Sequence, residues 1–400
     1  MVLMVSSKPS KSFGLSSKDS EVQEIVQELY GNLDGKSVTE RSFGKGKIIW
    51  GKPVEEVLEE LNINPDFSFT SENQDAAIHY IHKTVGDIEF YFVSNHRRRK
   101  ERIVCSFRLS GKQPEIWSSD RGSSYEAAIY ETSAGRTMLP LEMEPAGSCF
   151  IVFKKNAKPA YHALLKDGKE VLSVAPFKEP DADQYRDVQN TFTVALWAKP
   201  DTFAHNGRSM LFHPPAGEEV YGKGHAAFGL SAGQNAVRVY ERSSGAREVL
   251  SYSKPISGWT HIAVVYQDAK PSLFINGKSA SVGTPSAFIV HPGLETIVVQ
   301  DHFTSFFEGN HTKPELFTKA LSPAEIDALF RKGLPDSINT PSASVALNPN
   351  GKLKALFWSN GKYALKGPNS VKEIGLITQC NSRSLSGSWK VQFPKGTGAP

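Results

Sequence analysis

The spacing of apolar residues along this chain changes once, from the 3.6-residue period of helices to the two-residue period of strands. Before about residue 65, apolar residues recur three and four positions apart. From about residue 75 onward they alternate with polar residues over short runs that turn residues separate. Because each period commits a segment to one kind of secondary structure, the fold is predicted to be mainly β. We expect multidomain β-sandwiches with a short α/β segment at the N-terminus.

Residues 1–68 are predicted to be the C-terminal remnant of an α/β domain. After a loop over the first 19 residues, Ser20 would open a helix by a capping box, and the apolar stripe of that helix is formed by Val22, Ile25, Val26 and Leu29. One strand follows at Lys47–Trp50, and a second helix begins with Pro53 near its first position. Since one strand cannot make a stable doubly wound sheet, the beginning of this domain is expected to be missing.

The β region is predicted to hold two sandwiches and the start of a third. Residues 75–155 contain short alternating runs and a turn at Gly86-Asp87, as a small β-sandwich would. Residues 186–336 contain the hairpin dipeptide Asn276-Gly277 and close with a short helix capped by Ser322. Residues 350–400 would begin an incomplete sandwich with strands at 353–358 and 388–393. We therefore expect the chain to be a fragment of a longer one.

Composition excludes several classes of protein. The 400 residues include 46 Lys+Arg and 42 Asp+Glu, a net charge of +4 that does not predict nucleic-acid binding. No apolar run is long enough to predict a membrane span. Three cysteines, Cys105, Cys149 and Cys380, cannot form a disulfide framework or a zinc motif, so they are interpreted as buried thiols.

No residue can be nominated as catalytic from the sequence. The sequence predicts no G-x-S-x-G nucleophile elbow and contains no HExxH motif, and neither Gly44-Lys-Gly46 nor Gly222-Lys-Gly224 has the spacing of a phosphate loop. Glu115 and Asp301 cannot be singled out among 42 acidic residues. The sequence therefore predicts no catalytic residue and no metal site, and the glycan-binding residues are unknown.

Three groups of residues have both a functional and a structural interpretation. Six tryptophans could stack on sugar rings, although core packing is favoured: Trp50, Trp117, Trp197, Trp259, Trp358 and Trp389. His79 and His82 would lie on opposite faces of a strand, which argues against a metal pair. The basic cluster His96–Arg102 would suit an acidic glycan, nucleic acid or an import receptor, but a solvated hairpin turn is favoured.

Residues 188–333 resemble a laminin-G-like, or concanavalin-A-like, jelly roll. The resemblance rests on four stretches: Phe192–Trp197, Gly258–Tyr266, Leu273–Gly277 and Lys319–Ile326. It implies two facing sheets whose concave face or loop rim often binds glycans or proteins. Calcium is common in that family, but no acidic cluster stands at a matching loop. No cofactor is therefore expected, and calcium is possible but unsupported.

The flanking regions resemble bacterial α-L-rhamnosidases of glycoside hydrolase family 106, over roughly residues 5–155 and 350–400. The matching stretches are Phe43–Gly51, Val57–Leu61, Pro65–Phe67, Asp87–Asn95, Ser106–Trp117, Ser359–Tyr363 and Leu385–Phe393. The basic insert at 96–102 departs from the family, which usually has a more neutral turn there. The resemblance places the chain downstream of the catalytic barrel of that family, with the laminin-G-like domain inserted. A (β/α)₈ barrel needs about 250 residues, which the region before the first β unit cannot supply.

The resemblances imply an accessory, carbohydrate-binding part of a glycoside hydrolase that acts on plant or microbial polysaccharide. The expected partners are carbohydrate and the remainder of a longer chain, with no nucleic acid. The chain alone is expected to be inactive, and it would be secreted or periplasmic if the family resemblance holds. Two alternatives remain: a free-standing lectin-like glycan-binding protein, and a laminin-G-type adhesion or interaction module.

Overall fold

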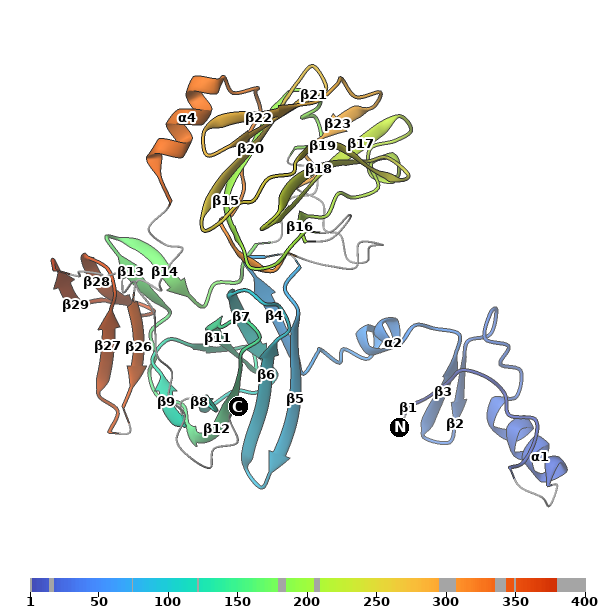
Figure 1. Cartoon of the computed structure of the whole chain (residues 1–400). Coiled ribbons are helices and arrows are strands. Elements are labelled where there is room, and N and C mark those ends of the chain that lie inside the picture. The colour runs from blue at the N-terminus through green and yellow to red at the C-terminus, as the bar shows by residue number, and fades with distance from the viewer. Residues whose placement is uncertain are drawn as a thin grey trace, which may run out of the picture. The chain divides into compact units, whose positions relative to one another are not determined.

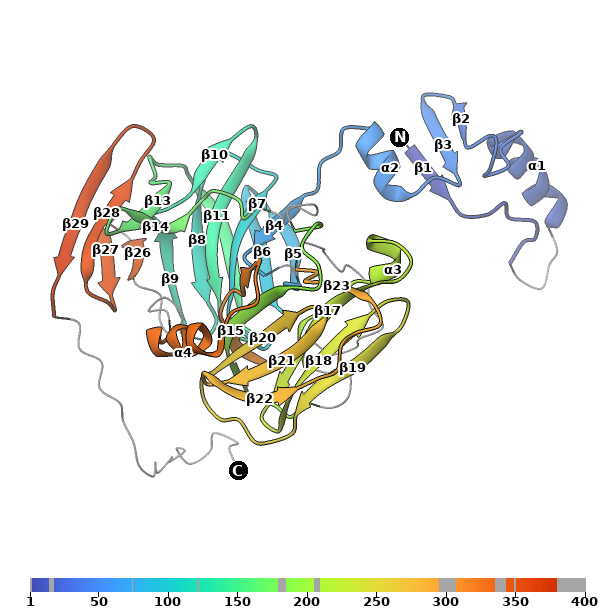
Figure 2. The ribbon, with the colours of Figure 1, turned by 90° about the horizontal axis from the view of Figure 1, so that it is seen from above.

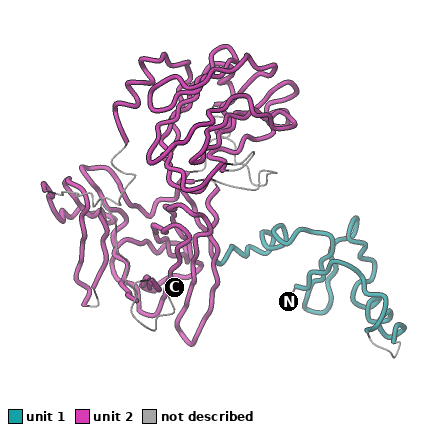
Figure 3. Tube along the Cα trace, in the orientation of Figure 1, with its two compact units in different colours: residues 1–66 teal, residues 67–400 magenta. Residues whose placement is uncertain are grey.

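The computed structural model has two compact units, residues 1–66 and 67–400 (Figure 3). It describes residues 2–13, 18–73, 75–120, 122–178, 185–204, 209–294, 307–334, 343–348 and 350–379. Strands dominate the described residues, and helices are few and short. The prediction of a mainly β fold with a short α/β segment at the N-terminus is confirmed. Among the described residues, no helix is both long and apolar enough to span a membrane.

The first unit is a small α/β unit around a three-stranded mixed sheet of order β1-β3-β2 (Figure 1). Its elements are β1 (Val2–Val5), α1 (Asp19–Tyr30), β2 (Glu40–Phe43), β3 (Gly46–Trp50) and α2 (Val54–Glu60). Tyr30, Leu33 and Ile48 form its buried core. The expectation of a single strand preceded by a loop was wrong. β1 is only four residues long, too short to show a period, and it pairs in parallel with a strand more than 40 positions later.

The predicted cap of the first helix was also wrong. Helix α1 begins at Asp19, so Ser20 lies inside its first turn and caps nothing. Ser12 stands at this end instead: its Oγ accepts the Lys18 backbone N–H at 2.9 Å, and its own N–H donates to the Asp19 carboxylate at 2.8 Å. In α2, Pro53 is the N-cap residue rather than the first helical residue.

A four-stranded and a seven-stranded sheet form a sandwich in the second unit. The four-stranded sheet has the order β10 (Glu131–Ser133), β11 (Arg136–Met143), β7 (Glu101–Phe107), β4 (Phe67–Ser71). The seven-stranded sheet has the order β27 (Leu353–Phe357), β26 (Ala343–Leu347), β9 (Ser123–Ala127), β8 (Lys112–Ser118), β12 (Ser148–Asn156), β6 (Ile88–Asn95), β5 (Ile78–Val85). Tyr91, Phe107 and Phe153 pack between them as a buried aromatic cluster, with ring centroids 4.8–6.0 Å apart.

A further four-stranded sheet joins residues that are far apart in sequence. Its order is β14 (Lys169–Ser173), β13 (Ala163–Lys166), β28 (Gly361–Lys366), β29 (Val371–Ile377). Residues 350–400 were predicted to begin a third sandwich. The described strands of this region instead pair with earlier parts of the chain. β28 pairs with β13, and β27 pairs with β26, which in turn pairs with β9. The predicted strand at 388–393 lies outside the described residues. The boundaries proposed for the domains stay predictions.

Between β14 and β26 the chain forms a jelly roll of two facing sheets (Figure 2). One sheet contains β22 (Lys278–Val282), β21 (Lys270–Ile275), β20 (Thr260–Gln267), β15 (Phe192–Pro200), β24 (Gly309–His311) and β25 (Glu315–Phe317). The other contains β16 (Met210–Phe212), β17 (His225–Gly233), β18 (Ala236–Arg242), β19 (Ala246–Tyr252) and β23 (Ile289–His291). A short helix, α3 (Gly217–Val220), precedes β17. Alternate residues of both sheets form one apolar core that includes Phe192, Phe228 and Tyr266.

Local turn and cap chemistry in the jelly roll is as predicted. Asn276-Gly277 forms a two-residue hairpin with φ of 49° and 77°, and Ile275 pairs with Lys278. Helix α4 (Pro323–Lys332) has the full capping box, in which Ser322 and Glu325 each bind the other's backbone N–H. Its Ile326 packs against the outer side of the β15–β20–β21 sheet. The helix therefore covers a face that would otherwise leave Ala263 and Phe274 exposed.

We predict that Ser322→Ala destabilises α4 by about 1 kcal/mol, because the Glu325 backbone N–H loses its acceptor. Hydrogen exchange of the 322–333 peptide should then quicken about fivefold. Ser20→Ala is the matched control, since Ser20 occupies no cap. Equal effects of the two changes on their own helices would contradict the assignment.

A second prediction concerns His261, which is buried between the rings of Trp197 and Phe330 at centroid distances of 5.3 and 6.2 Å. Its Nδ1 has no hydrogen-bond partner among the described residues. Burial lowers the pKa of His261 to about 4. The neutral ring therefore contributes stability above pH 6.5, and this contribution is lost as the pH falls from 6.5 towards 4.

Removing the His261 imidazole should flatten the pH dependence of the unfolding free energy. We expect His261→Phe to reduce the loss of unfolding free energy between pH 7 and pH 4 by about 3 kcal/mol. Urea unfolding followed by tryptophan fluorescence measures it. The same pH dependence in both proteins would show that His261 does not titrate in this way.

Candidate functional site

The tryptophans lie in different environments. Trp197 stacks on Phe330 of α4 at 5.7 Å, and Trp50 meets Tyr30 edge-on at 6.2 Å in the first unit, so both pack internally. Trp259 is half-buried. Trp358 is 43% exposed, and Trp117 is half-buried on β8. Trp389 lies outside the described residues.

The two histidines of β5 are separated as predicted. His79 stacks on the ring of His96 at 3.8 Å, while His82 stacks on Tyr91 at 3.9 Å. The Nε2 of His82 is also 2.9 Å from the Glu89 carboxylate. Across the described residues, no group of three or more potential metal-ligating side chains comes together.

The basic cluster His96–Arg102 is not a solvated hairpin turn, and that interpretation was wrong. It connects β6 to β7, which belong to different sheets. Arg99 is only 3% exposed and lies between two carboxylates, with its Nη1 3.0 Å from Asp75 and its Nε 2.7 Å from Glu101. Asp75 lies 24 positions earlier, so sequence spacing gave no signal of this contact.

The charges of this cluster are set by burial and pairing together. Burial opposes ionisation of Asp75, but the Arg99 guanidinium outweighs it, so the pKa of Asp75 lies below its usual range. For Glu101 burial prevails over Arg99, and the pKa is raised. Arg98, in contrast, is 73% exposed, and its nearest carboxylate oxygen, on Glu308, is 3.9 Å away. The central cation of the cluster, Arg99, is thus paired with carboxylates inside the protein.

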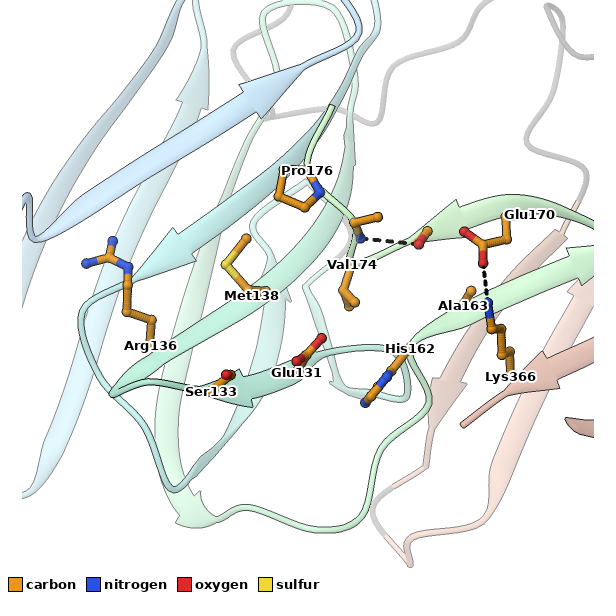
Figure 4. A pocket seen from close by; sticks show the side chains of 12 residues that line it. Glu131, Ser133, Arg136, Met138, His162, Ala163, Glu170, Val174, Pro176 and Lys366 are labelled. Atoms are coloured by element: carbon orange, nitrogen blue, oxygen red, sulfur yellow. Dashed lines mark hydrogen bonds and ion pairs between the residues drawn. The ribbon is translucent and has the colours of Figure 1, made fainter. Parts of the chain in front are cut away.

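A groove of about 480 Å³ opens in the second unit between the β10–β11 hairpin and the sheet of β13, β14 and β28 (Figure 4). We call it the polar groove. It is lined by Glu131, Ser133, Arg136, Met138, His162, Ala163, Glu170, Ser173, Val174, Ala175, Pro176 and Lys366. These residues come from three separate regions of the sequence, and no motif links them. Sequence reasoning therefore had no signal for this groove.

Three charged side chains of the polar groove are held in place. Lys366 donates to Glu170 at 2.8 Å, and this hydrogen bond lowers the pKa of that carboxyl (Figure 4). Arg136 donates from Nε to the Ser106 hydroxyl at 2.6 Å and from Nη2 to the Ser106 carbonyl at 2.9 Å. Glu170 is therefore poorly suited to act as a general acid near neutral pH.

The remaining lining offers hydrogen-bonding groups beside a small apolar wall. Glu131 and His162 are both half-buried at the groove, and Met138, Val174 and Pro176 supply the apolar surface. Carboxylate and imidazole groups can accept and donate hydrogen bonds to hydroxyls. Such a mixture of polar and apolar groups suits a hydroxyl-rich ligand with a hydrocarbon framework.

Burial and pairing account for three further side chains that the sequence singled out, Cys105, Cys149 and Glu115. Cys105 and Cys149 are buried free thiols in the sandwich core, and burial raises the pKa of Cys149 to about 12. The interpretation as buried thiols is confirmed for these two, whereas Cys380 lies outside the described residues. Burial favours the neutral form of Glu115, but hydrogen bonds from Lys154 and Trp117 outweigh it and lower its pKa. Asp301 also lies outside the described residues.

Comparison with protein families assigns two parts of the chain. Residues 2–132 match the family model of alpha-L-rhamnosidase. Residues 179–327 match the model of the concanavalin A-like lectin/glucanases superfamily. We call these the rhamnosidase-like segment and the lectin-like domain. Both resemblances predicted from the sequence are confirmed over these residues. The predicted rhamnosidase resemblance of residues 350–400 stays a prediction.

Individual relatives share only parts of their length with this chain. A protein of Formosa agariphila described as "Putative beta-glucuronidase" is 31% identical over 159 residues, which are 39% of this chain and 12% of that protein. A rhamnosidase structure from Novosphingobium sp. PP1Y has 22% identity and a TM-score of 0.32, over 55% of this chain and 18% of that one. Domain 4 of a GH43 extracellular arabinanase from Geobacillus stearothermophilus, solved with arabinotriose, has 17% identity and a TM-score of 0.26, over 55% and 98%.

The buried cation of the rhamnosidase-like segment generates a stability prediction. Arg99→Ala should lower the unfolding free energy by about 3–5 kcal/mol, because it removes the guanidinium that pairs with the buried Glu101 and the half-buried Asp75. Arg98→Ala, one position away and exposed, should cost less than about 1 kcal/mol. Thermal unfolding of the two variants measures the difference. Similar losses in both would mean that Arg99 is not held as described.

Proposed function

We propose that this chain is an accessory, carbohydrate-binding part of a glycoside hydrolase of the α-L-rhamnosidase type, acting on plant or microbial polysaccharide. The observation that carries the proposal is the succession of a rhamnosidase-like segment and a lectin-like domain in one chain. Neither a carbohydrate ligand nor an accessory role follows from that order alone. The chemistry of the described residues adds the second support.

The polar groove supplies that support. It brings charged and hydroxyl-bearing side chains together with an apolar wall, as a sugar-binding surface requires. Its one ion-paired acid, Glu170, has a lowered pKa, which suits a fixed hydrogen-bond acceptor better than an acid catalyst. Binding without bond cleavage is the function that this arrangement favours.

The proposal predicts binding without turnover. In gels that contain a soluble rhamnan, rhamnogalacturonan or arabinan, at least one polysaccharide should retard the purified chain relative to bovine serum albumin. The same protein should release no nitrophenol from 4-nitrophenyl α-L-rhamnopyranoside. An unretarded chain would contradict carbohydrate binding, and robust turnover would contradict the accessory role.

The groove can be tested with matched variants. The double change Glu131→Ala and His162→Ala removes two groove hydrogen-bonding groups and should weaken polysaccharide binding about tenfold. Glu373→Ala on β29 is the control, because this exposed acid pairs only with the equally exposed Lys362 among the described residues. Unchanged binding by the double variant would show that the groove is not a binding site.

A further inference from the structure

The seven-stranded sheet has an aromatic outer face. Its inner face supplies Tyr91, Ile116 and Ile151 to the sandwich core. Side chains alternate across a strand, so Phe92, Phe150 and Trp117 point to the opposite side. The strand register places these three in one row, because Phe150 is paired with Phe92 on one side and with Trp117 on the other.

The row is open at the surface. Phe150 is 36% exposed at its centre, and Ile81, which continues the row on the edge strand β5, is 68% exposed. The rings of Phe92 and Phe150 lie 5.1 Å apart. Neighbouring strands are about 4.8 Å apart, so the three aromatic positions span about 10 Å, comparable to the length of two pyranose rings.

Charged groups stand at the Trp117 end of this row and are fixed there. The Trp117 indole N–H donates to the Glu115 carboxylate at 3.1 Å, and Lys154 lies 2.8 Å from the same carboxylate. The Lys154 ammonium also lies 5.0 Å from the centroid of the Trp117 ring. Glu115 is buried, so these contacts hold the indole in one orientation. The result is an aromatic surface with hydrogen-bonding groups at its edge.

We propose that Phe92, Phe150 and Trp117 form an aromatic platform that binds a neutral polysaccharide. The C–H faces of the sugar rings would cover the aromatic rings, and ring hydroxyls would reach the partly exposed Lys154 at the edge. This platform is separate from the polar groove, and its ligand class rests on the proposed function. A sugar presents apolar faces and hydroxyls side by side, which matches aromatic rings with the Lys154 ammonium beside Trp117.

The decisive experiment compares variants of the full chain by affinity electrophoresis in a neutral rhamnan and in hydroxyethylcellulose. Trp117→Ala and Phe150→Ala should each weaken binding at least fivefold to whichever probe the wild type binds. Trp117→Phe should retain most of the binding. Trp358→Ala is the matched control, because Trp358 is also exposed but lies outside the row; it should bind as the wild type does.

A measurement on the unmodified chain covers the case in which a variant does not fold. In hydroxyl-radical footprinting, bound polysaccharide should protect the peptides that contain Trp117 and Phe150, and it should leave the Trp358 peptide unchanged. No protection at the row would overturn the platform. A concentration-dependent dimer that Trp117→Ala abolishes would also overturn it, because the face would then belong to a second copy.

The two proposals fail in different ways. If Trp117→Ala binds normally while the Glu131→Ala, His162→Ala variant does not, the platform is wrong and carbohydrate binding stands. If the wild-type chain binds no polysaccharide in any gel, the platform and the proposed function are both wrong.

Discussion

The antiparallel pairing of β13 with β28 is the constraint on which much of the second unit depends. It joins residues on either side of the lectin-like domain, and the ion pair between Lys366 and Glu170 fastens strands 196 positions apart. The polar groove exists only because of this closure, since Lys366 arrives from β28 while His162 and Glu170 come from the region before the inserted domain. A contact between such distant segments costs more loop entropy than a hairpin does, so the buried Leu164, Tyr363 and Leu365 of this sheet must offset that cost.

Local chemistry in the sequence was a reliable guide to turns and caps, and a poor guide to partners. The Asn276-Gly277 hairpin and the Ser322 capping box depend on neighbours within a few positions, so their residues alone determined them. β1 and the polar groove depend on contacts between distant segments, and no local sequence pattern predicts such contacts. Arg99 shows the same limit: the run of basic residues resembled a solvated turn, and Asp75, the partner of the buried Arg99, belonged to no motif.

The structure separates two uses of charge and aromatic surface within one sandwich. Arg99 is enclosed with its carboxylates and stabilises the fold. Lys154 and Glu115 instead pair at the rim of an open aromatic row. Net charge and aromatic content cannot distinguish these uses, because Arg99 is placed by its contact with Asp75, 24 positions earlier, and Lys154 by the side of β12 that it occupies. Alternating side chains predict that the seven-stranded sheet has two different faces. Only its packing against the four-stranded sheet shows which face is turned inward.

The closure by β13 and β28 also determines how the chain would carry a mechanical load. The lectin-like domain lies between β14 and β26, and the regions that flank it pair with each other in two sheets, β13 with β28 and β9 with β26. Tension applied between the two flanking parts of the chain would be carried by the hydrogen bonds of these two pairings. The lectin-like domain would bear none of it until both pairings break. The lectin-like domain would therefore remain unstrained while the flanking strands are pulled.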